Sequence, residues 1–170
     1  MRLTLLLLRH AEAAPAGAGQ GDRDRALTRR GRRDAEKMGR ELAKRGLGPD
    51  LALSSGARRA DETMNLVLNQ TRAEPRQMVA PELYEADEGT LVRRLRASGG
   101  EAGTILMVGH NPSLEALAAL MQGGDFGSVA RLSSGFPPGA LAVCEMEASD
   151  WAGFQPKLVM LRGLLLPELL

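Results

Sequence analysis

The segment Leu3-Thr4-Leu5-Leu6-Leu7-Leu8-Arg9-His10-Ala11-Glu12 is the stretch from which the fold can be predicted. A short apolar run ends abruptly at an arginine and a histidine, and sequence rich in alanine and glycine follows. Such a run is typical of a strand that is buried on both faces. Ligands of open α/β sheets bind at the carboxyl ends of strands. We therefore expect Arg9 and His10 to lie where a phosphoryl group can be bound and attacked.

The remaining apolar patterns alternate between short strands and amphipathic helices. Further strands are predicted over 51–54, 77–79, 104–108, 140–146 and 157–161. Helices are predicted over 28–45, from 55 to about 68, from about 88 to 98, and from 112 to about 122, with Thr28, Ser55 and Asn111 as N-caps. This alternation predicts a three-layer α/β/α sandwich with a mostly parallel central sheet. We expect the last two strands to form an antiparallel hairpin at the sheet edge.

Length and composition limit the class of protein. The chain has 170 residues, of which 44% are hydrophobic and 25% charged, so we expect one globular domain over 1–170. The formal net charge is only +1 and aromatic residues make up 3%, which argues against nucleic-acid binding. No apolar stretch approaches the ~18 residues that a membrane span needs. We therefore expect neither nucleic acid nor membrane among the partners.

The cysteine content and the N-terminus bear on location. Cys144 is the only cysteine, so no internal disulfide can form and cysteine-rich metal sites are excluded. We expect its side chain to fill a small space in the core. The first residues resemble a signal peptide, but Arg9 and His10 interrupt the apolar run before any cleavage site. The sequence thus favours a cytoplasmic protein.

Polar side chains follow three predicted strands at the point where each ends. These side chains are Arg9 with His10, Arg58 with Arg59, and His110, and they include both histidines of the chain. Taken singly, a histidine after a strand is most often a satisfied polar residue, and an arginine on a helix usually lies at the surface. Together they suit a phosphoryl group, because arginine forks match its oxygens and an imidazole can attack phosphorus.

Other segments allow more than one interpretation. Residues 13–25 lack periodicity and the Gly-Lys-Ser/Thr ending of a nucleotide-binding loop, and we expect them to shape the pocket mouth. The arginines at 29, 30, 32 and 33 are interpreted as a solvated helix face, partly balanced by Asp34, Glu36 and Glu41, although they oppose the helix dipole and can instead face an anionic partner. The apolar tail over 164–170 either packs onto the body or forms a dimer contact, and the oligomeric state stays open.

Four motifs taken together resemble the histidine phosphatase superfamily, also called the phosphoglycerate mutase-like family. Leu8-Arg9-His10-Ala11 is similar to its Arg-His-Gly signature. The segment over 54–63, Ser-Ser-Gly-Ala-Arg-Arg-Ala-Asp-Glu-Thr, resembles its Ser-Ser-Pro-x-x-Arg-Ala-x-Gln-Thr motif. Val108-Gly109-His110-Asn111-Pro112 resembles its second-histidine motif. With Leu27-Thr28-x-x-Gly31, the short chain is most similar to the SixA-type phosphohistidine phosphatase branch, which implies a phosphoglycerate mutase-like fold.

The resemblance also implies roles for individual residues. His10 is the implied nucleophile that becomes phosphorylated, while Arg9, Arg59 and His110 hold the phosphoryl oxygens. From the chemistry of the anion we expect His110 to be protonated. Relatives that act on phosphate esters use a carboxylic acid to protonate the leaving group, and Glu85 is the best-placed candidate here. A solvated loop carboxylate is the alternative interpretation of Glu85.

The alignment distinguishes two adjacent arginines and exposes three departures. Ala60 and Thr63 fix the register so that Arg59 is the phosphate ligand, which leaves Arg58 at the surface or the pocket rim. Ala11 replaces the family glycine, Gly56 the proline, and Glu62 the glutamine. Glu62 can either orient the guanidinium of Arg59 or lie exposed, and the sequence does not decide between these two.

The leading hypothesis is therefore a metal-independent phosphatase without cofactors, acting on phosphohistidine in a partner protein or on a small phosphate ester. A small-molecule phosphomonoesterase or a mutase would use the same residues. A module that binds a phosphorylated ligand without turnover is an alternative of another class, but it has no need of His10. A zinc site built from both histidines and carboxylates is a further alternative, and no short ligand spacing supports it.

Overall fold

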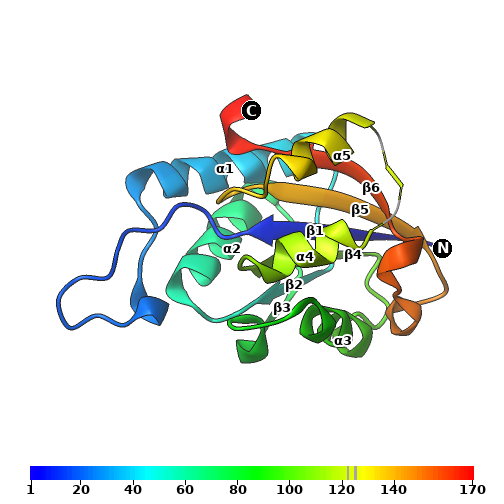
Figure 1. The fold of residues 1–170 in the computed structure, drawn as a ribbon, viewed down its shortest axis with the longest axis horizontal. Helices are drawn as coiled ribbons and strands as arrows, with labels where there is room; N and C mark the ends of the chain where they lie inside the picture. Colours follow the sequence, from blue (N-terminus) through cyan, green and yellow to red (C-terminus); the bar gives the residue numbers. More distant parts are fainter. Residues whose placement is uncertain (122, 125) are drawn as a thin grey trace.

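The computed structural model describes residues 1–121, 123–124 and 126–170. In this part of the chain a six-stranded sheet lies between layers of helices (Figure 1). The strands are β1 (Arg2–Arg9), β2 (Leu51–Ser54), β3 (Arg76–Val79), β4 (Thr104–Gly109), β5 (Leu141–Glu147) and β6 (Met160–Leu165). The helices are α1 (Arg29–Lys44), α2 (Arg58–Thr71), α3 (Glu88–Ser98), α4 (Ser113–Ala119) and α5 (Phe126–Ser133).

The strand order is β3-β2-β4-β1-β5-β6, with β1 near the middle (Figure 1). Strands β3, β2, β4 and β1 are parallel, whereas β5 is antiparallel to both of its neighbours, β1 and β6. The prediction of a mostly parallel sheet with an antiparallel pair at its edge is thus confirmed. In the register of β1 with β4, Arg9 lies opposite Gly109, so the residues that follow them, His10 and His110, leave the sheet side by side.

Strand β1 is buried on both faces, as its apolar run predicts. Leu5 and Leu7 belong to a core cluster that includes residues of α3 and α4. Leu6 and Leu8 belong to a second cluster with residues of α1 and α2 on the other face. Cys144 of β5 is fully buried in the first cluster, as expected. Alternation of side chains along a strand explains this division.

Helix α1 begins at the cap that the sequence predicts. The Thr28 hydroxyl oxygen accepts a hydrogen bond from the Gly31 amide at 2.9 Å, and the helix ends at Lys44. Its apolar residues face α2 and the sheet, while the arginines of its first turn are exposed. Arg30 lies 3.7 Å from Asp34, so the interpretation as a partly balanced, solvated face is met for this pair. Gly31 is buried because the helix packs directly against the Glu12 backbone.

Two predicted helix caps are wrong. Helix α2 begins at Arg58 with Ala57 as its N-cap, two residues after the predicted cap Ser55. The Ser55 hydroxyl contacts His110 instead, so a buried polar partner determines its place. Helix α4 begins at Ser113 with Pro112 as N-cap, one residue later than predicted from Asn111.

The last third of the chain departs most from the prediction. The strand predicted over 157–161 starts at Met160, because a 3-10 turn covers Pro156–Leu158. Helix α5 was not predicted, since its sequence is short and interrupted by glycine and serine. Part of the apolar tail continues β6, where Leu164 and Leu165 are buried, so these residues pack onto the body. No helix within the described residues has the length and apolarity to cross a membrane.

Replacing Gly31 with alanine tests the close contact between α1 and the chain after β1. The added Cβ would lie 2.1 Å from the Glu12 carbonyl oxygen, so the helix must shift. We expect Gly31→Ala to lower the free energy of unfolding by roughly 1–3 kcal/mol in urea titrations. Gly89→Ala in α3 is the control, because its Cβ would meet the end of the flexible Arg93 side chain at 3.4 Å and would lie at an ordinary contact distance of 3.6 Å from the Asp87 carboxylate. That control should gain up to about 1 kcal/mol, and equal behaviour of both variants would contradict the packing argument.

Candidate active site

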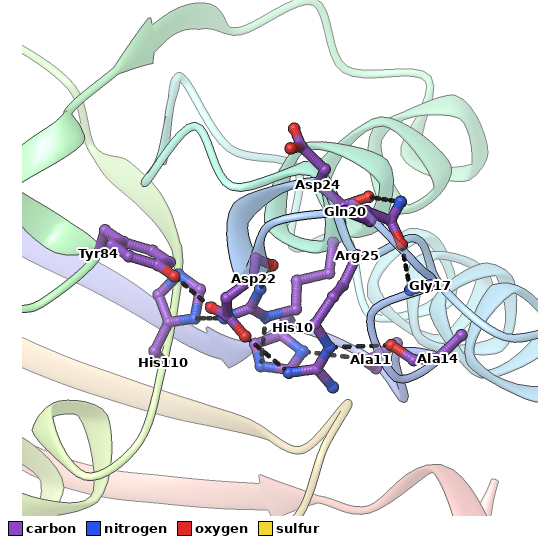
Figure 2. A network of polar contacts seen from close by, with 11 residues as sticks. His10, Ala11, Ala14, Gly17, Gln20, Asp22, Asp24, Arg25, Tyr84 and His110 are labelled. Atoms are coloured by element: carbon purple, nitrogen blue, oxygen red, sulfur yellow. Dashed lines mark hydrogen bonds and ion pairs between the residues drawn. The ribbon is translucent and has the colours of Figure 1, made fainter.

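The carboxyl ends of β1, β2 and β4 open into one polar pocket of about 450 Å³. Its lining is dominated by polar and charged side chains from five separate parts of the chain: Arg9 and His10, Asp22 and Arg25, Arg59, Tyr84 and Glu85, and His110. Figure 2 shows how the side chains of this network converge. Of the residues predicted at the strand ends, Arg9, His10, Arg59 and His110 therefore meet in one place, whereas Arg58 does not.

His10 presents one ring nitrogen to the pocket. Its Nδ1 lies 2.7 Å from the Ala11 carbonyl oxygen, which can only accept, so Nδ1 carries the proton. Its Nε2 lies 3.4 Å from Nε of Arg59, which can only donate. The lone pair of His10 is therefore on Nε2, facing the guanidinium of Arg59. A fixed tautomer with a free Nε2 is the form that a nucleophilic histidine requires.

His110 lies beside His10, with ring centroids 5.2 Å apart. Its Nε2 lies 2.7 Å from the Ser55 hydroxyl oxygen, and its Nδ1 lies 3.5 Å from Nη2 of Arg59. Because arginine can only donate, Nδ1 is the acceptor and Nε2–H donates to Ser55. Nδ1 of His110 and Nε2 of His10 thus both face Arg59.

The two predicted phosphate-binding arginines reach the pocket from different elements. Arg59 in the first turn of α2 is 6% exposed and bridges both imidazoles. Arg9 at the end of β1 donates from Nη1 to the Phe136 carbonyl oxygen at 3.0 Å. Its Nε is buried without a hydrogen-bond partner among the described residues. A buried guanidinium donor of this kind is costly unless an anion satisfies it.

The hydroxyl group of Thr63 links the segment after β1 to the first turn of α2. Thr63 Oγ1 accepts a hydrogen bond from the Ala11 amide at 3.0 Å and donates one to the Arg59 carbonyl oxygen at 2.6 Å. Thr63 is fully buried, so this link is shielded from water. It ties the residue after His10 to the residue that carries the central guanidinium.

Burial and positive charge keep both histidines neutral near neutral pH. The pKa of His10 is lowered to about 4, mainly by burial. Repulsion from Arg59 and Arg9 lowers it further, whereas the hydrogen bond to the Ala11 carbonyl raises it. The pKa of His110 is lowered to about 3 by burial and then by His10 and Arg59. The expectation of a protonated His110 concerns the site with a bound phosphoryl group; in the ligand-free protein no anion offsets the neighbouring cations, and the imidazole is neutral.

Asp22, Tyr84 and Arg25 are site residues that the sequence did not identify. The Asp22 carboxylate accepts from the Tyr84 hydroxyl and from Arg59 at 3.1 Å, and on its other oxygen from Arg25 at 3.0 Å. The hydroxyl of Tyr84 and the guanidinium of Arg25 hold the pKa of Asp22 well below its usual range. For Asp22 and Arg25, the sequence signal is that they belong to a charged loop after β1. Both line the pocket, so the expectation that residues 13–25 shape it is met.

The remaining predicted residues lie at the rim of the pocket or outside it. Glu85 lines the pocket and is exposed, and it makes no hydrogen bond or ion pair within the described part of the chain. Arg58 is exposed and pairs with Glu62 at 2.9 Å, in agreement with a surface position outside the pocket lining. Glu62 contacts neither His10 nor Arg59: its other oxygen accepts from the Leu27 amide at 2.8 Å, so it holds the end of the loop. Within residues 1–121, 123–124 and 126–170, no group of three or more His, Cys, Asp or Glu is arranged to hold a metal ion.

Comparison with protein families matches residues 5–98 to the histidine phosphatase superfamily (branch 1). An uncharacterized protein of Mycobacterium tuberculosis is 34% identical over 164 residues, which covers 95% of this chain and 100% of the relative. The matched family segment includes the strand end with His10 and the helix with Arg59.

Solved structures agree with the family match. A candidate phosphohistidine phosphatase SixA from Agrobacterium tumefaciens is 34% identical, with a TM-score of 0.78, covering 97% of this chain and 99% of that one. A second candidate SixA phosphohistidine phosphatase, from Nakamurella multipartitia, is 27% identical with a TM-score of 0.80, covering 98% and 97% of the two chains. The similarity therefore extends over the whole sheet and its helices.

The neutral state of both histidines makes stability depend on pH. In the unfolded chain each titrates near ~6.5, whereas in the folded protein their pKa values are about 4 and about 3. Below ~6.5 the unfolded chain binds more protons, so the histidine contribution is complete above that pH and is lost as the pH falls toward the folded pKa values. The expected slope is at most about 1.4 kcal/mol per pH unit for each proton.

Urea unfolding followed between about pH 7.5 and 4 measures this slope. The variant His110→Gln should flatten the dependence, because it removes one titrating imidazole. Nuclear magnetic resonance titration of the ring protons should place both pKa values below ~5 in the absence of phosphate. Imidazoles that titrate near ~6.5 in the folded protein would contradict this account of the site.

Proposed function

Because the chain belongs to the histidine phosphatase superfamily (branch 1), we propose that it hydrolyses phosphohistidine in a partner protein through a phosphoryl intermediate on His10. The observation that carries this proposal is the orientation of His10. Its Nδ1 is held by the Ala11 carbonyl, so Nε2 faces the guanidinium of Arg59, which also contacts His110. A nucleophile fixed beside phosphate-binding donors suits in-line attack on phosphorus.

In the first step Nε2 of His10 attacks the phosphoryl group. A bond forms between Nε2 and phosphorus, and the bond between phosphorus and the substrate nitrogen breaks. The leaving imidazole takes up a proton as it departs. Arg9 and Arg59 bind the non-bridging oxygens, which carry about two negative charges near neutral pH. Buried Nε of Arg9, which has no partner among the described residues, gains an acceptor in this state.

His110 completes the anion site. In the free protein its Nδ1 accepts from Arg59, and the imidazole is neutral. Burial and the neighbouring cations lower the pKa of His110, and a bound dianion offsets the effect of the cations. The imidazole then binds a proton on Nδ1 and donates a hydrogen bond from it to a phosphoryl oxygen. Its other nitrogen stays on the Ser55 hydroxyl, 2.7 Å away, which keeps the ring oriented. His110 is thereby a charge-compensating ligand that is switched on by the substrate.

In the second step water attacks the phosphoryl group on His10. The bond from Nε2 to phosphorus breaks, inorganic phosphate is released, and the free imidazole is restored. Electrostatic stabilisation of a transferring phosphoryl group usually contributes more to the rate than any other single effect. Every group required by the two steps belongs to the chain itself, and we propose that the reaction needs no metal ion.

The leaving group decides how far an acid is needed. Imidazole titrates near ~6.5, whereas an unactivated alcohol titrates close to water, ~15.7. Asp22 cannot serve as the acid near neutral pH, because its neighbours keep its pKa low. Glu85 at the rim is our candidate, but no side chain holds it in place within the described residues. An imidazole leaving group tolerates such a weakly positioned acid, which favours phosphohistidine over phosphate esters.

Two further observations support a protein substrate. Two structural relatives with more than 25% identity are candidate phosphohistidine phosphatases, and they match nearly the whole chain. The pocket lies at the carboxyl ends of the strands and has exposed residues around it, so a protruding phosphohistidine can enter. The lone buried cysteine is compatible with a reducing compartment, and we expect the protein to act in the cytoplasm.

Replacement of His10 tests the nucleophile. His10→Ala is expected to lower kcat/KM for a phosphohistidine protein by roughly 10⁴-fold or more, because it removes the proposed nucleophile. The wild type should form an alkali-stable, acid-labile phosphoenzyme after a short reaction, and His10→Ala should form none. Calorimetry should show that the variant still binds inorganic phosphate.

The same assay separates the alternative functions. A ranking of kcat/KM over phosphohistidine protein, phosphosugars and aryl phosphate identifies the substrate class, and chelator should leave all rates unchanged. Higher kcat/KM for a phosphosugar would favour a small-molecule phosphomonoesterase or mutase. Absence of turnover on every compound, with phosphate binding retained, would indicate a binding module.

Replacement of Glu85 tests the acid. Glu85→Gln should lower kcat/KM for an alkyl phosphate by roughly 10²-fold, since the alkoxide must be protonated as it leaves. For phosphohistidine the same change should cost no more than about threefold, because imidazole leaves with a readily acquired proton. Glu88→Gln, a nearby carboxylate that does not line the pocket, is the control. An equal loss on both substrates would remove Glu85 from the role of acid.

A further inference from the structure

The 3-10 turn over Asp22–Asp24 places a carboxylate among the cationic groups of the pocket. Figure 2 shows the Asp22 side chain between His110 and the group formed by His10 and Arg25. Its Oδ2 accepts from Nη2 of Arg59 at 3.1 Å and from the Tyr84 hydroxyl. Its Oδ1 accepts from Nη1 of Arg25 at 3.0 Å.

Residue 22 engages both terminal nitrogens of Arg59. Nη2 donates to the carboxylate, and Nη1 donates to the backbone carbonyl oxygen of Asp22 at 2.8 Å. The third nitrogen, Nε, donates to Nε2 of His10. Oxygens of residue 22 therefore already bind both terminal nitrogens of the guanidinium that is expected to hold two phosphoryl oxygens. Charge-assisted bonds from an arginine fork suit a carboxylate and a phosphoryl group equally well.

We propose that Asp22 is an internal competitor for the phosphoryl group and sets the affinity with which the pocket takes anions. This inference rests on the proposed function only in assigning Arg59 to the phosphoryl oxygens. An incoming phosphoryl group must displace the Asp22 carboxylate from the Arg59 guanidinium. Because the carboxylate carries one charge and the phosphoryl group about two, a dianion is favoured in this exchange over a singly charged ligand.

Asp22 is placed so that it can be displaced without unfolding. Its side chain is 51% exposed, whereas that of Arg59 is 7% exposed, so the carboxylate can turn toward water while the guanidinium stays. The loop keeps its own bonds when this happens: Gln20 donates to the Asp24 carbonyl oxygen at 2.8 Å, and Arg25 donates from Nε to the Ala14 carbonyl oxygen at 2.8 Å. Displacement therefore exchanges polar partners and leaves the core intact.

Asp24 supplies a matched control two residues away. It lies in the same 3-10 turn and carries the same charge, but its carboxylate points away from the two histidines (Figure 2). It does not line the pocket. A change in the overall charge of the loop affects Asp22 and Asp24 variants alike, whereas competition for Arg59 affects Asp22 variants alone.

The experiment measures equilibrium binding of inorganic phosphate by titration calorimetry at about pH 7.5. We expect Asp22→Asn and Asp22→Ala to lower the Kd of phosphate roughly tenfold, and Asp24→Asn to leave it within about twofold of the wild type. Thermal unfolding of each variant checks that the fold is retained, and Asp22→Asn preserves the size of the side chain.

Unchanged or weaker phosphate binding in both Asp22 variants would overturn the proposal, and would make Asp22 a residue that holds Arg59 in position. Equal tightening in Asp24→Asn would overturn it as well, by assigning the effect to loop charge. The measurement needs no turnover, so it is separate from the proposed function. A protein that hydrolyses no phosphorylated compound can still show the tenfold gain.

Discussion

Parallel pairing of β1 with β4 is the constraint on which the site depends. The register that places Arg9 opposite Gly109 brings the residues after each strand, His10 and His110, out of the sheet together, with ring centroids 5.2 Å apart. The pairing runs without a shift from Thr4 opposite Thr104 to Arg9 opposite Gly109, so the two strands end level. The apolar run that is buried in the core thus also carries His10 to its place beside His110.

The pocket holds several cationic side chains next to two neutral histidines. Burial removes charge from His10 and His110, and the guanidinium groups of Arg9 and Arg59 reinforce this effect. The positive potential is then balanced locally by oxygens of the chain, among them the Phe136 carbonyl and the Asp22 carboxylate. The result is a site that is stable without a ligand and in which Nε of Arg9, which has no partner among the described residues, is in place for an anion. Preorganised donors of this type do not have to be rearranged when charge develops during the reaction.

The sequence predicted the parts of the fold that follow from local pattern. The run before Arg9 indicated a buried strand, and Thr28 marked the start of α1, because both signals lie within a few neighbouring residues. The cap predicted at Ser55 failed because its hydroxyl is used by His110, 55 residues away. Local sequence pattern does not predict the contacts of Asp22 for the same reason: its partners Arg59 and Tyr84 lie 37 and 62 residues further along the chain. The resemblance selected Arg59, but only the packed loop shows what that guanidinium holds.

The hydroxyl of Thr63 has a consequence for how the chain can vary. It bonds the Ala11 amide and the Arg59 carbonyl at once, in a fully buried position. Valine has nearly the same shape, but it would take the acceptor away from the Ala11 amide, at a desolvation penalty of about 1–3 kcal/mol. Serine keeps the oxygen and gives up only a methyl group. Position 63 therefore requires a hydroxyl group more strictly than a particular size. A more hydrophobic residue there would break the link between Ala11, which follows the nucleophile, and Arg59.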